Sequence, residues 1–346
     1  MFPDKLLLWE AEIDCSLQSN FRYMLKRVPL ICLGLVVAIF ALAITFGGPG
    51  SPHPMGSVID PFSSVDFSDL PRLSSFAARD GTKLAYRSYA MAASAPRGGS
   101  VVLIHGSSAT GSSMHPMAKA LSAVGFATYA LDIRGHGGSG RKGQVAYIGQ
   151  LEDDLTDFMH AVLPPQPVTL AGFSSGGGFA VRFGGSNQQQ LFQSYLLLAP
   201  FLSPDAPTLR RDAGGWTSVG LPRIIAIAIL NGFGVKTFNS LPVLRFALSE
   251  NTKTILTPEY SYSLAMNFGP QKDYLANLRS MHQPISVLIG QNDEIYYPDR
   301  FADVLRQAGK DAPVTVIPGV DHIHLVLSPT AFDKSIEALR NLRSQK

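Results

Sequence analysis

The chain has 346 residues, enough for one large domain with insertions or for two small domains. Hydrophobic residues make up 46% of it and charged residues only 16%, which supports a sizeable core and argues against general disorder. The formal net charge of +3 is too small a bias to form a concentrated basic face, so no nucleic-acid partner is expected. Both cysteines, Cys15 and Cys32, lie before or inside an apolar N-terminal stretch, and this excludes a disulfide framework.

The apolar stretch covers residues 28–46 and reads VPLICLGLVVAIFALAITF. It carries no charge and approaches the roughly 20 residues that a helix needs to cross a bilayer. Basic residues precede it at Arg22, Lys26 and Arg27, and none follows it closely. The positive-inside tendency therefore places residues 1–27 in the cytoplasm and the rest of the chain outside it, anchored to the membrane on the periplasmic or extracellular side.

Two other interpretations of this stretch stay open. If translation starts at Met24, the run ending in ALA has the layout of a cleavable signal peptide, and the mature protein would be secreted. The stretch could also be a buried core helix, although the basic flank and the following GGPGSPHPMGS favour an anchor and a linker. Residues 47–75 are therefore predicted to be a linker, and residues 76–346 the folded domain.

Strand and helix patterns alternate along the folded domain. Asp80-Gly81 between two half-apolar runs predicts a hairpin. Buried strands are predicted at residues 100–106, 126–133, 167–173, 194–201, 285–290 and 314–319. Helices are predicted at residues 114–124, 148–162 and 299–308, and in a last segment that Ser328 caps and Pro329 begins. This alternation is typical of an α/β fold with a mostly parallel central sheet and helices on both faces.

The sequence GFSSG, residues 172–176, is a G-x-S-x-G motif between the apolar strand PVTLA and the start of a helix. Glycines on both sides allow the tight strand-to-helix turn that exposes a serine, and a helix N-terminus behind it favours developing negative charge. The pattern alone is common, but this context predicts that Ser174 is a nucleophile rather than part of an ordinary turn.

A serine hydroxyl needs a base to take its proton, and the base needs an acid to orient it. His322 follows the last predicted strand, and Asp293 follows the strand before it. The chain order Ser174, Asp293, His322 is one that a catalytic triad uses on this architecture. His324 is the alternative base and Glu294 the alternative acid. We prefer His322 and Asp293 for these roles.

An oxyanion hole needs two backbone N–H groups. One is expected from Ser175, which follows the nucleophile, and the other from Ser107, in the loop HGSS after the first central strand. Gly106 lets that loop approach closely, and His105 is expected to be a structural turn residue.

The segments LIHGSS, LDIRGHGGSG, GFSSGG, IGQNDE and PGVDH together resemble the α/β-hydrolase superfamily, particularly its monoacylglycerol lipase and lysophospholipase-like group of the serine aminopeptidase type. The resemblance covers roughly residues 76–340, apart from the insertion described below. It implies an α/β-hydrolase fold and hydrolysis of esters through an acyl-enzyme. It does not identify the acid or the alcohol of the substrate.

Two motifs suggest ligands that we do not expect. GHGGSG, residues 135–140, matches G-x-G-x-x-G, but it does not open a helix directly, as the dinucleotide fingerprint must. Asp321, His322 and His324 lack the spacing and partners of a metal site. No cofactor and no metal are therefore predicted.

Residues 203–270 interrupt the alternation and are predicted to form an inserted cap. Within them, residues 221–232 begin with Leu-Pro and end with Asn-Gly, which predicts a short helix that is apolar all round. At about 1.5 Å per residue this helix is too short to span a bilayer. It could be a lid over the substrate or a packing helix, and the sequence leaves both open.

The sequence thus predicts a serine hydrolase for lipid-like or small acyl esters. A serine aminopeptidase is the first alternative, but residues 203–283 carry five acidic residues against eight basic ones, and this balance disfavours recognition of a free amine. A non-catalytic, membrane-tethered binding protein on the same fold is the second alternative, and the complete set of catalytic positions argues against it.

Overall fold

A computed structural model describes residues 29–211 and 214–344. The chain divides into two compact units, one of residues 1–48 with 221–236 and the other of residues 49–220 with 237–346. The predicted cytoplasmic segment, residues 1–27, and its basic residues lie outside the described residues.

The second unit is built on an eight-stranded sheet with the strand order β1-β2-β4-β3-β5-β6-β10-β11. The strands are β1 (Leu73–Ala77), β2 (Lys83–Tyr89), β3 (Ser100–Ile104), β4 (Ala127–Leu131), β5 (Val168–Phe173), β6 (Ser194–Leu198), β10 (Ile285–Gly290) and β11 (Val314–Ile317). β2 pairs antiparallel with β1 and β4, and every other pairing in this sheet is parallel. The predicted hairpin and the mostly parallel sheet are both confirmed.

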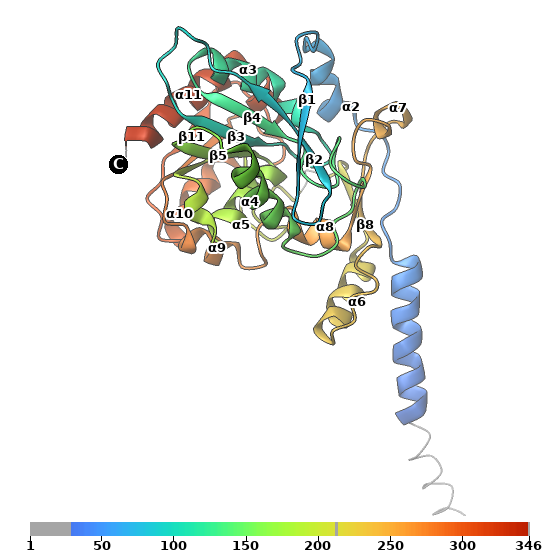
Figure 1. Cartoon of the computed structure of the whole chain (residues 1–346). Coiled ribbons are helices and arrows are strands. Elements are labelled where there is room, and N and C mark those ends of the chain that lie inside the picture. Colours follow the sequence, from blue (N-terminus) through green and yellow to red (C-terminus); the bar gives the residue numbers. More distant parts are fainter. Residues whose placement is uncertain (1–28, 212–213, 345–346) are drawn as a thin grey trace, which may run out of the picture. The chain divides into compact units, whose positions relative to one another are not determined.

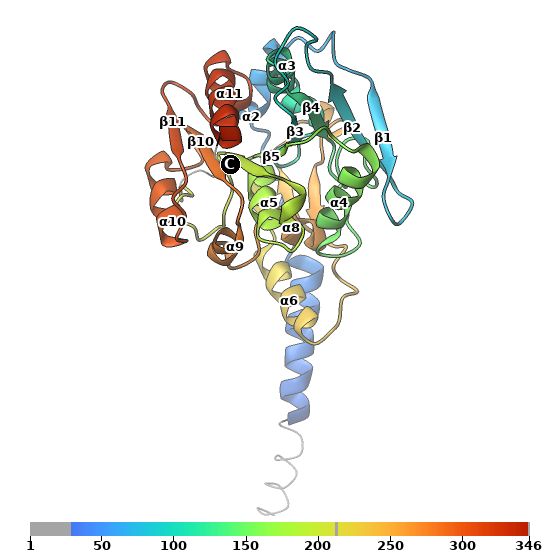
Figure 2. The same ribbon diagram turned by 60° about the vertical axis from the view of Figure 1, so that its left-hand side comes forward.

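Helices cover both faces of the sheet. On one face lie α3 (His115–Ala123) and α11 (Pro329–Ser344), and on the other lie α4 (Gln150–Val162), α5 (Ser175–Gly184), α9 (Tyr274–Ser280) and α10 (Phe301–Gln307), as Figures 1 and 2 show. The Ser328 hydroxyl caps α11 by accepting a hydrogen bond from the Ala331 N–H at 3.3 Å, as predicted. Because helices shield both faces, the central strands are continuous apolar runs rather than alternating ones.

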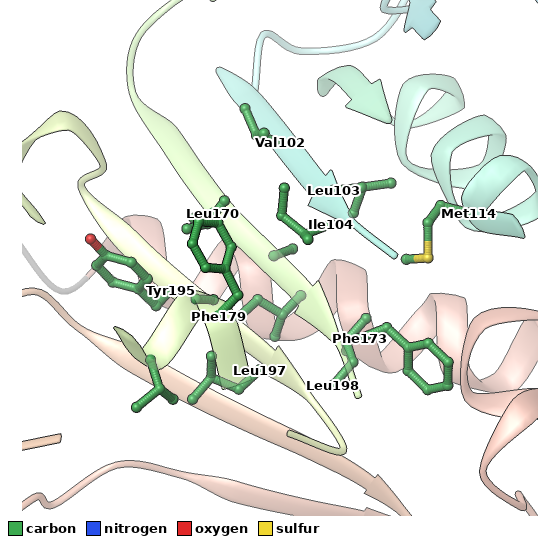
Figure 3. Packing of buried hydrophobic residues seen from close by; sticks show 14 of the residues in the cluster. Val102, Leu103, Ile104, Met114, Leu170, Phe173, Phe179, Tyr195, Leu197 and Leu198 are labelled. Carbon is green, nitrogen blue, oxygen red and sulfur yellow. The ribbon is translucent and has the colours of Figure 1, made fainter. Parts of the chain in front are cut away.

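The core lies on both sides of the central strands. Figure 3 shows Val102, Leu103 and Ile104 of β3 beside Leu170 of β5, with Phe179 of α5 packed nearby. None of these side chains is more than 1% exposed. Burial at roughly 25 cal/mol per Å² of apolar surface makes this layer the main source of stability and a rigid support for the loops at the strand ends.

Two regions differ from the sequence prediction. Residues 47–75 are not a plain linker, because they contain α2 (Gly56–Ile59) and a 3₁₀ turn (Asp60–Ser64), and β1 already begins at Leu73. Val58, Ile59 and Phe62 pack against the core, which explains why this segment is ordered in spite of its many glycines and prolines.

The inserted region contains a second sheet that was not predicted. In the second unit it forms the antiparallel sheet β7-β8-β9, with β7 (Thr217–Val219), β8 (Pro242–Phe246) and β9 (Glu259–Ser261), and the short helices α7 (Glu250–Lys253) and α8 (Tyr262–Asn267). Two of these strands have three residues each, too few to show an alternating pattern.

The first unit contains two apolar helices. One spans Pro29–Phe46, has a mean hydropathy of 2.7 and is not buried, so by length and composition it could cross a membrane. The other is α6 (Leu221–Gly232), which confirms the helix predicted at these residues.

Candidate active site

Ser174 lies directly between β5 and α5, at a sharp turn of the backbone. Its φ of 54° and ψ of −118° fall in a region that residues other than glycine rarely adopt. The surrounding chain holds this conformation: the Ser174 N–H donates to the Leu198 carbonyl at 2.9 Å, and the Ser174 carbonyl accepts from the Phe201 N–H at 3.0 Å. Strain of this kind is found where a side chain must be presented at a functional site.

Both glycines of the motif are required by close contacts. A Cβ at Gly172 would lie 2.2 Å from the Gly176 carbonyl oxygen, and a Cβ at Gly176 would lie 2.4 Å from the carbonyl oxygen of His105. These are backbone atoms that cannot move aside cheaply. The G-x-S-x-G pattern is therefore a steric requirement of the turn.

Asp293 and His322 form a buried pair at the ends of β10 and β11. His322 Nδ1 lies 2.8 Å from Asp293 Oδ2, and the two residues are 2% and 1% exposed. Asp293 Oδ1 accepts hydrogen bonds from the backbone N–H groups of Ile295 at 2.9 Å and Tyr296 at 2.8 Å. A carboxylate fixed in this way can orient the imidazole and stabilise its protonated form.

The alternatives for base and acid are placed differently. His324 is half exposed, and its ring bonds to Asp321 at 2.8 Å. Glu294 accepts the backbone N–H of His322 at 3.1 Å, so it supports the histidine without touching its ring. The geometry therefore favours His322 and Asp293.

Ser174 is connected to this pair through two aromatic residues. The centroid of the Phe173 ring lies 4.7 Å from the centroid of the His322 ring, and the centroid of the Tyr296 ring lies 5.4 Å from it. Burial raises the pKa of the Tyr296 phenol, and its hydrogen bond with Ser174 acts in the opposite direction. A direct bond between Ser174 Oγ and His322 is not among the hydrogen bonds of the described residues, and in free enzymes such bonds often tighten only when substrate binds.

Ser107 and Ser175 also meet at the site, because their hydroxyls are hydrogen-bonded to each other. This contact joins the loop after β3 to the first residue of α5. The first N–H groups of a helix have no partner within it and carry partial positive charge. The Ser175 N–H, at the start of α5, is therefore available to an oxyanion beside Ser174, and the hydroxyl contact places Ser107 next to it.

Sequence reasoning missed a set of contacts that hold Ser108, the residue after Ser107. The backbone φ of Ser108 is 65°. The Ser108 N–H donates to Tyr260 Oη at 2.6 Å, and the Ser108 hydroxyl donates to the Thr257 carbonyl at 2.7 Å. In return, the Thr257 N–H donates to the Ser108 carbonyl at 2.9 Å. The inserted region thus fixes the candidate oxyanion loop, and no local pattern around Tyr260 could have revealed this.

Two buried histidines complete this support. Tyr260 Oη lies 2.6 Å from His136 Nε2, and His136 Nδ1 faces the Arg134 carbonyl at 3.3 Å, so Nδ1 carries the ring proton and Nε2 accepts from the phenol. This requires a neutral imidazole, and burial lowers the pKa of His136 well below its usual value, followed in importance by the nearby His105. His105 is also buried, and its Nδ1 bonds to the Gly106 carbonyl at 2.8 Å, in keeping with the structural turn residue predicted from the sequence.

The loop after β4 carries the segment that matches G-x-G-x-x-G. Helix α4 begins only at Gln150, ten or more residues later in the chain, so the loop does not have the geometry of a dinucleotide site. Within residues 29–211 and 214–344, no group of three His, Cys, Asp or Glu side chains could hold a metal ion.

The mostly parallel sheet, the strained serine at a strand-to-helix turn and the buried Asp–His pair at later strand ends define an α/β hydrolase. The profile of the serine aminopeptidase S33 family matches residues 95–326, and the chain belongs to this family.

Three similar proteins illustrate the relationship. A monoacylglycerol lipase of Mycolicibacterium smegmatis is 37% identical over 95 residues, which are 26% of this chain and 33% of that protein. The chain therefore matches only about a third of this curated relative's length. A soluble variant of monoglyceride lipase from Saccharomyces cerevisiae has a TM-score of 0.58 at 18% identity, covering 79% of this chain and 95% of that one. A membrane phospholipase A has a TM-score of 0.53 at 17% identity and covers 98% and 99% of the two chains.

Proposed function

We propose that the protein hydrolyses carboxylic esters through an acyl-serine intermediate. Ser174 Oγ attacks the ester carbonyl carbon while His322 takes the hydroxyl proton, and Asp293 stabilises the imidazolium that forms. The N–H groups of Ser107 and Ser175 stabilise the negative charge on the tetrahedral oxygen. The observation that carries this proposal is the buried Asp293–His322 pair beside a strained serine.

The second half of the cycle uses the same groups. The intermediate collapses as the bond to the alcohol breaks, and His322 gives its proton to the leaving oxygen. His322 then takes a proton from water, which attacks the acyl-serine ester, and the acid is released as the proton returns to Ser174. No cofactor is needed for any step.

Lipid-like or small acyl esters are the substrates that we favour. The partial match to a monoacylglycerol lipase supports this class. The family's aminopeptidase chemistry would require acidic groups for a free α-amine, and the excess of basic over acidic residues at positions 203–283 opposes it.

A substrate panel tests this proposal. The full-length protein in mild detergent should cleave p-nitrophenyl esters of graded chain length, monoacylglycerols or lysophospholipids, and should leave aminoacyl anilides intact. Release of p-nitrophenol or fatty acid is the measurement, with Ser174→Ala as the matched control. Faster cleavage of the anilides would establish the aminopeptidase instead, and a folded protein inactive on every compound would favour the binding protein.

We also propose that the Pro29–Phe46 helix anchors the protein to a membrane with the hydrolase domain outside the cytoplasm. The support is the helix's length, its mean hydropathy of 2.7 and the basic residues before it. A reporter that folds only after export, fused after Lys346, should therefore be active. Activity from a reporter that works only in the cytoplasm would contradict this topology, and the mass of the purified protein would show whether the leader is cleaved.

A further inference from the structure

The end of the Pro29–Phe46 helix is held by an arginine of α6. Arg223 Nε donates to the Ile44 carbonyl at 2.8 Å, and Nη2 donates to the Thr45 carbonyl at 3.0 Å. The Arg223 backbone N–H also donates to the Gly47 carbonyl at 3.2 Å. The last carbonyls of a helix have no partner within the helix, and in lipid an unpaired carbonyl is costly. Arg223 therefore satisfies the exposed C-terminus of the N-terminal helix.

Two glycines allow this close approach. A Cβ at Gly47 would lie 2.8 Å from the Pro222 Cβ and 3.0 Å from the Arg223 nitrogen. A Cβ at Gly48 would lie 2.3 Å from Arg223 Nη1. The start of α6 thus contacts the end of the N-terminal helix directly, within one compact unit.

The exposed side of α6 is a row of large apolar side chains. Leu221, Ile225 and Ile229 are 57%, 50% and 44% exposed. They recur every four residues, so they share one face, which we call the α6 stripe. Solvent-exposed apolar rows of this kind mark contact surfaces. A packing helix would bury such side chains, so their exposure disfavours that interpretation for this face.

The charges around the α6 stripe fit a lipid surface. Residues 221–236, which form this part of the first unit, contain no aspartate or glutamate but include Arg223 and Lys236. Anionic lipid head groups attract basic residues next to an apolar helix face. With 12 residues, α6 is about 18 Å long at 1.5 Å per residue, which suits a helix lying in the interface.

We propose that the lipid bilayer covers the α6 stripe, and that the hydrogen bonds of Arg223 to the N-terminal helix hold α6 at the membrane surface where that helix ends. This inference rests on the proposed membrane anchor, because the position of α6 is fixed by that helix. The consequence is that the inserted region contacts the lipid phase, in which long-chain esters reside.

Site-specific fluorescence in vesicles tests the proposal. The full-length protein with Cys15→Ser and Cys32→Ser carries one cysteine, at Ile229→Cys or, as control, at the exposed polar position Gln307→Cys. Each cysteine is labelled with a nitrobenzoxadiazole dye, and the protein is placed in vesicles of phosphatidylethanolamine and phosphatidylglycerol. At position 229 the emission should shift to the blue and be quenched by spin-labelled lipids, and at position 307 it should not.

Flotation and ester hydrolysis on the same samples separate the possible failures. Protein that floats with the vesicles but shows aqueous emission at position 229 would overturn the lipid contact alone. Protein that does not float would overturn both the anchor and the lipid contact. Inactive protein with a quenched label would leave the lipid contact standing and reject the esterase. Arg223→Met should weaken quenching at position 229 without loss of flotation, and unchanged quenching would refute the role of Arg223.

Discussion

Replacing Ser174 with alanine should lower ester turnover by roughly 10⁵- to 10⁶-fold, because the nucleophile and its base act as one unit. The fold should persist, since alanine meets the same backbone strain at a φ of 54° as serine does. His322→Ala should cause a comparable loss. The measurements are kcat for a p-nitrophenyl ester and the melting temperature of each variant.

His324→Ala is the matched control for the base. This histidine is half exposed and bonded to Asp321, so its removal should change kcat little. If His324→Ala cripples turnover and His322→Ala is mild, the assignment of the base is wrong. If Ser174→Ala retains turnover, the serine mechanism is refuted, whatever the histidines do.

The parts of the site that could be predicted are those with local signals. The turn at Ser174 is indicated by two glycines between a buried strand and a helix. Each glycine is required because a Cβ at that position would collide with nearby backbone atoms. Asp293 and His322 were found because parallel strands end at one edge of a sheet, so residues just after two strands approach each other. The central strands could be recognised because a sheet buried on both faces turns them into short continuous apolar runs.

The parts that could not be predicted depend on contacts between distant residues. Ser108 and Tyr260 are hydrogen-bonded although they are 152 positions apart, and Tyr260 lies on a three-residue strand without visible periodicity. Tyr296 is one of two adjacent tyrosines after Asp293, and only the fold shows that it contacts Ser174. Residues 47–75 looked like a linker because their few apolar side chains are separated by glycine and proline.

The largest loss of stability is expected on replacing Arg134 with methionine. Arg134 makes two hydrogen bonds of 2.7 Å to Asp154 on α4 and two, of 2.9 and 3.1 Å, to Asp80 in the β1–β2 turn. The side chains of Arg134 and Asp154 are only 8% and 9% exposed. Burial raises the pKa of Asp154, and Arg134 opposes this effect, so removing the arginine leaves a buried carboxylate without its cation. The free energy of unfolding should fall by about 3–5 kcal/mol.

Arg79→Met is the matched control, since it removes the same charge next to the same helix. Arg79 pairs with Asp153 and Asp157, but its side chain is 48% exposed, so this loss should stay within about 1 kcal/mol. Urea unfolding of the two variants in the same detergent gives both values. The deficit of Arg134→Met should shrink as the pH falls, because a carboxyl whose folded pKa is raised becomes neutral and no longer needs a partner. Equal losses for the two variants, or a deficit that grows on acidification, would show that the buried pair does not act in this way.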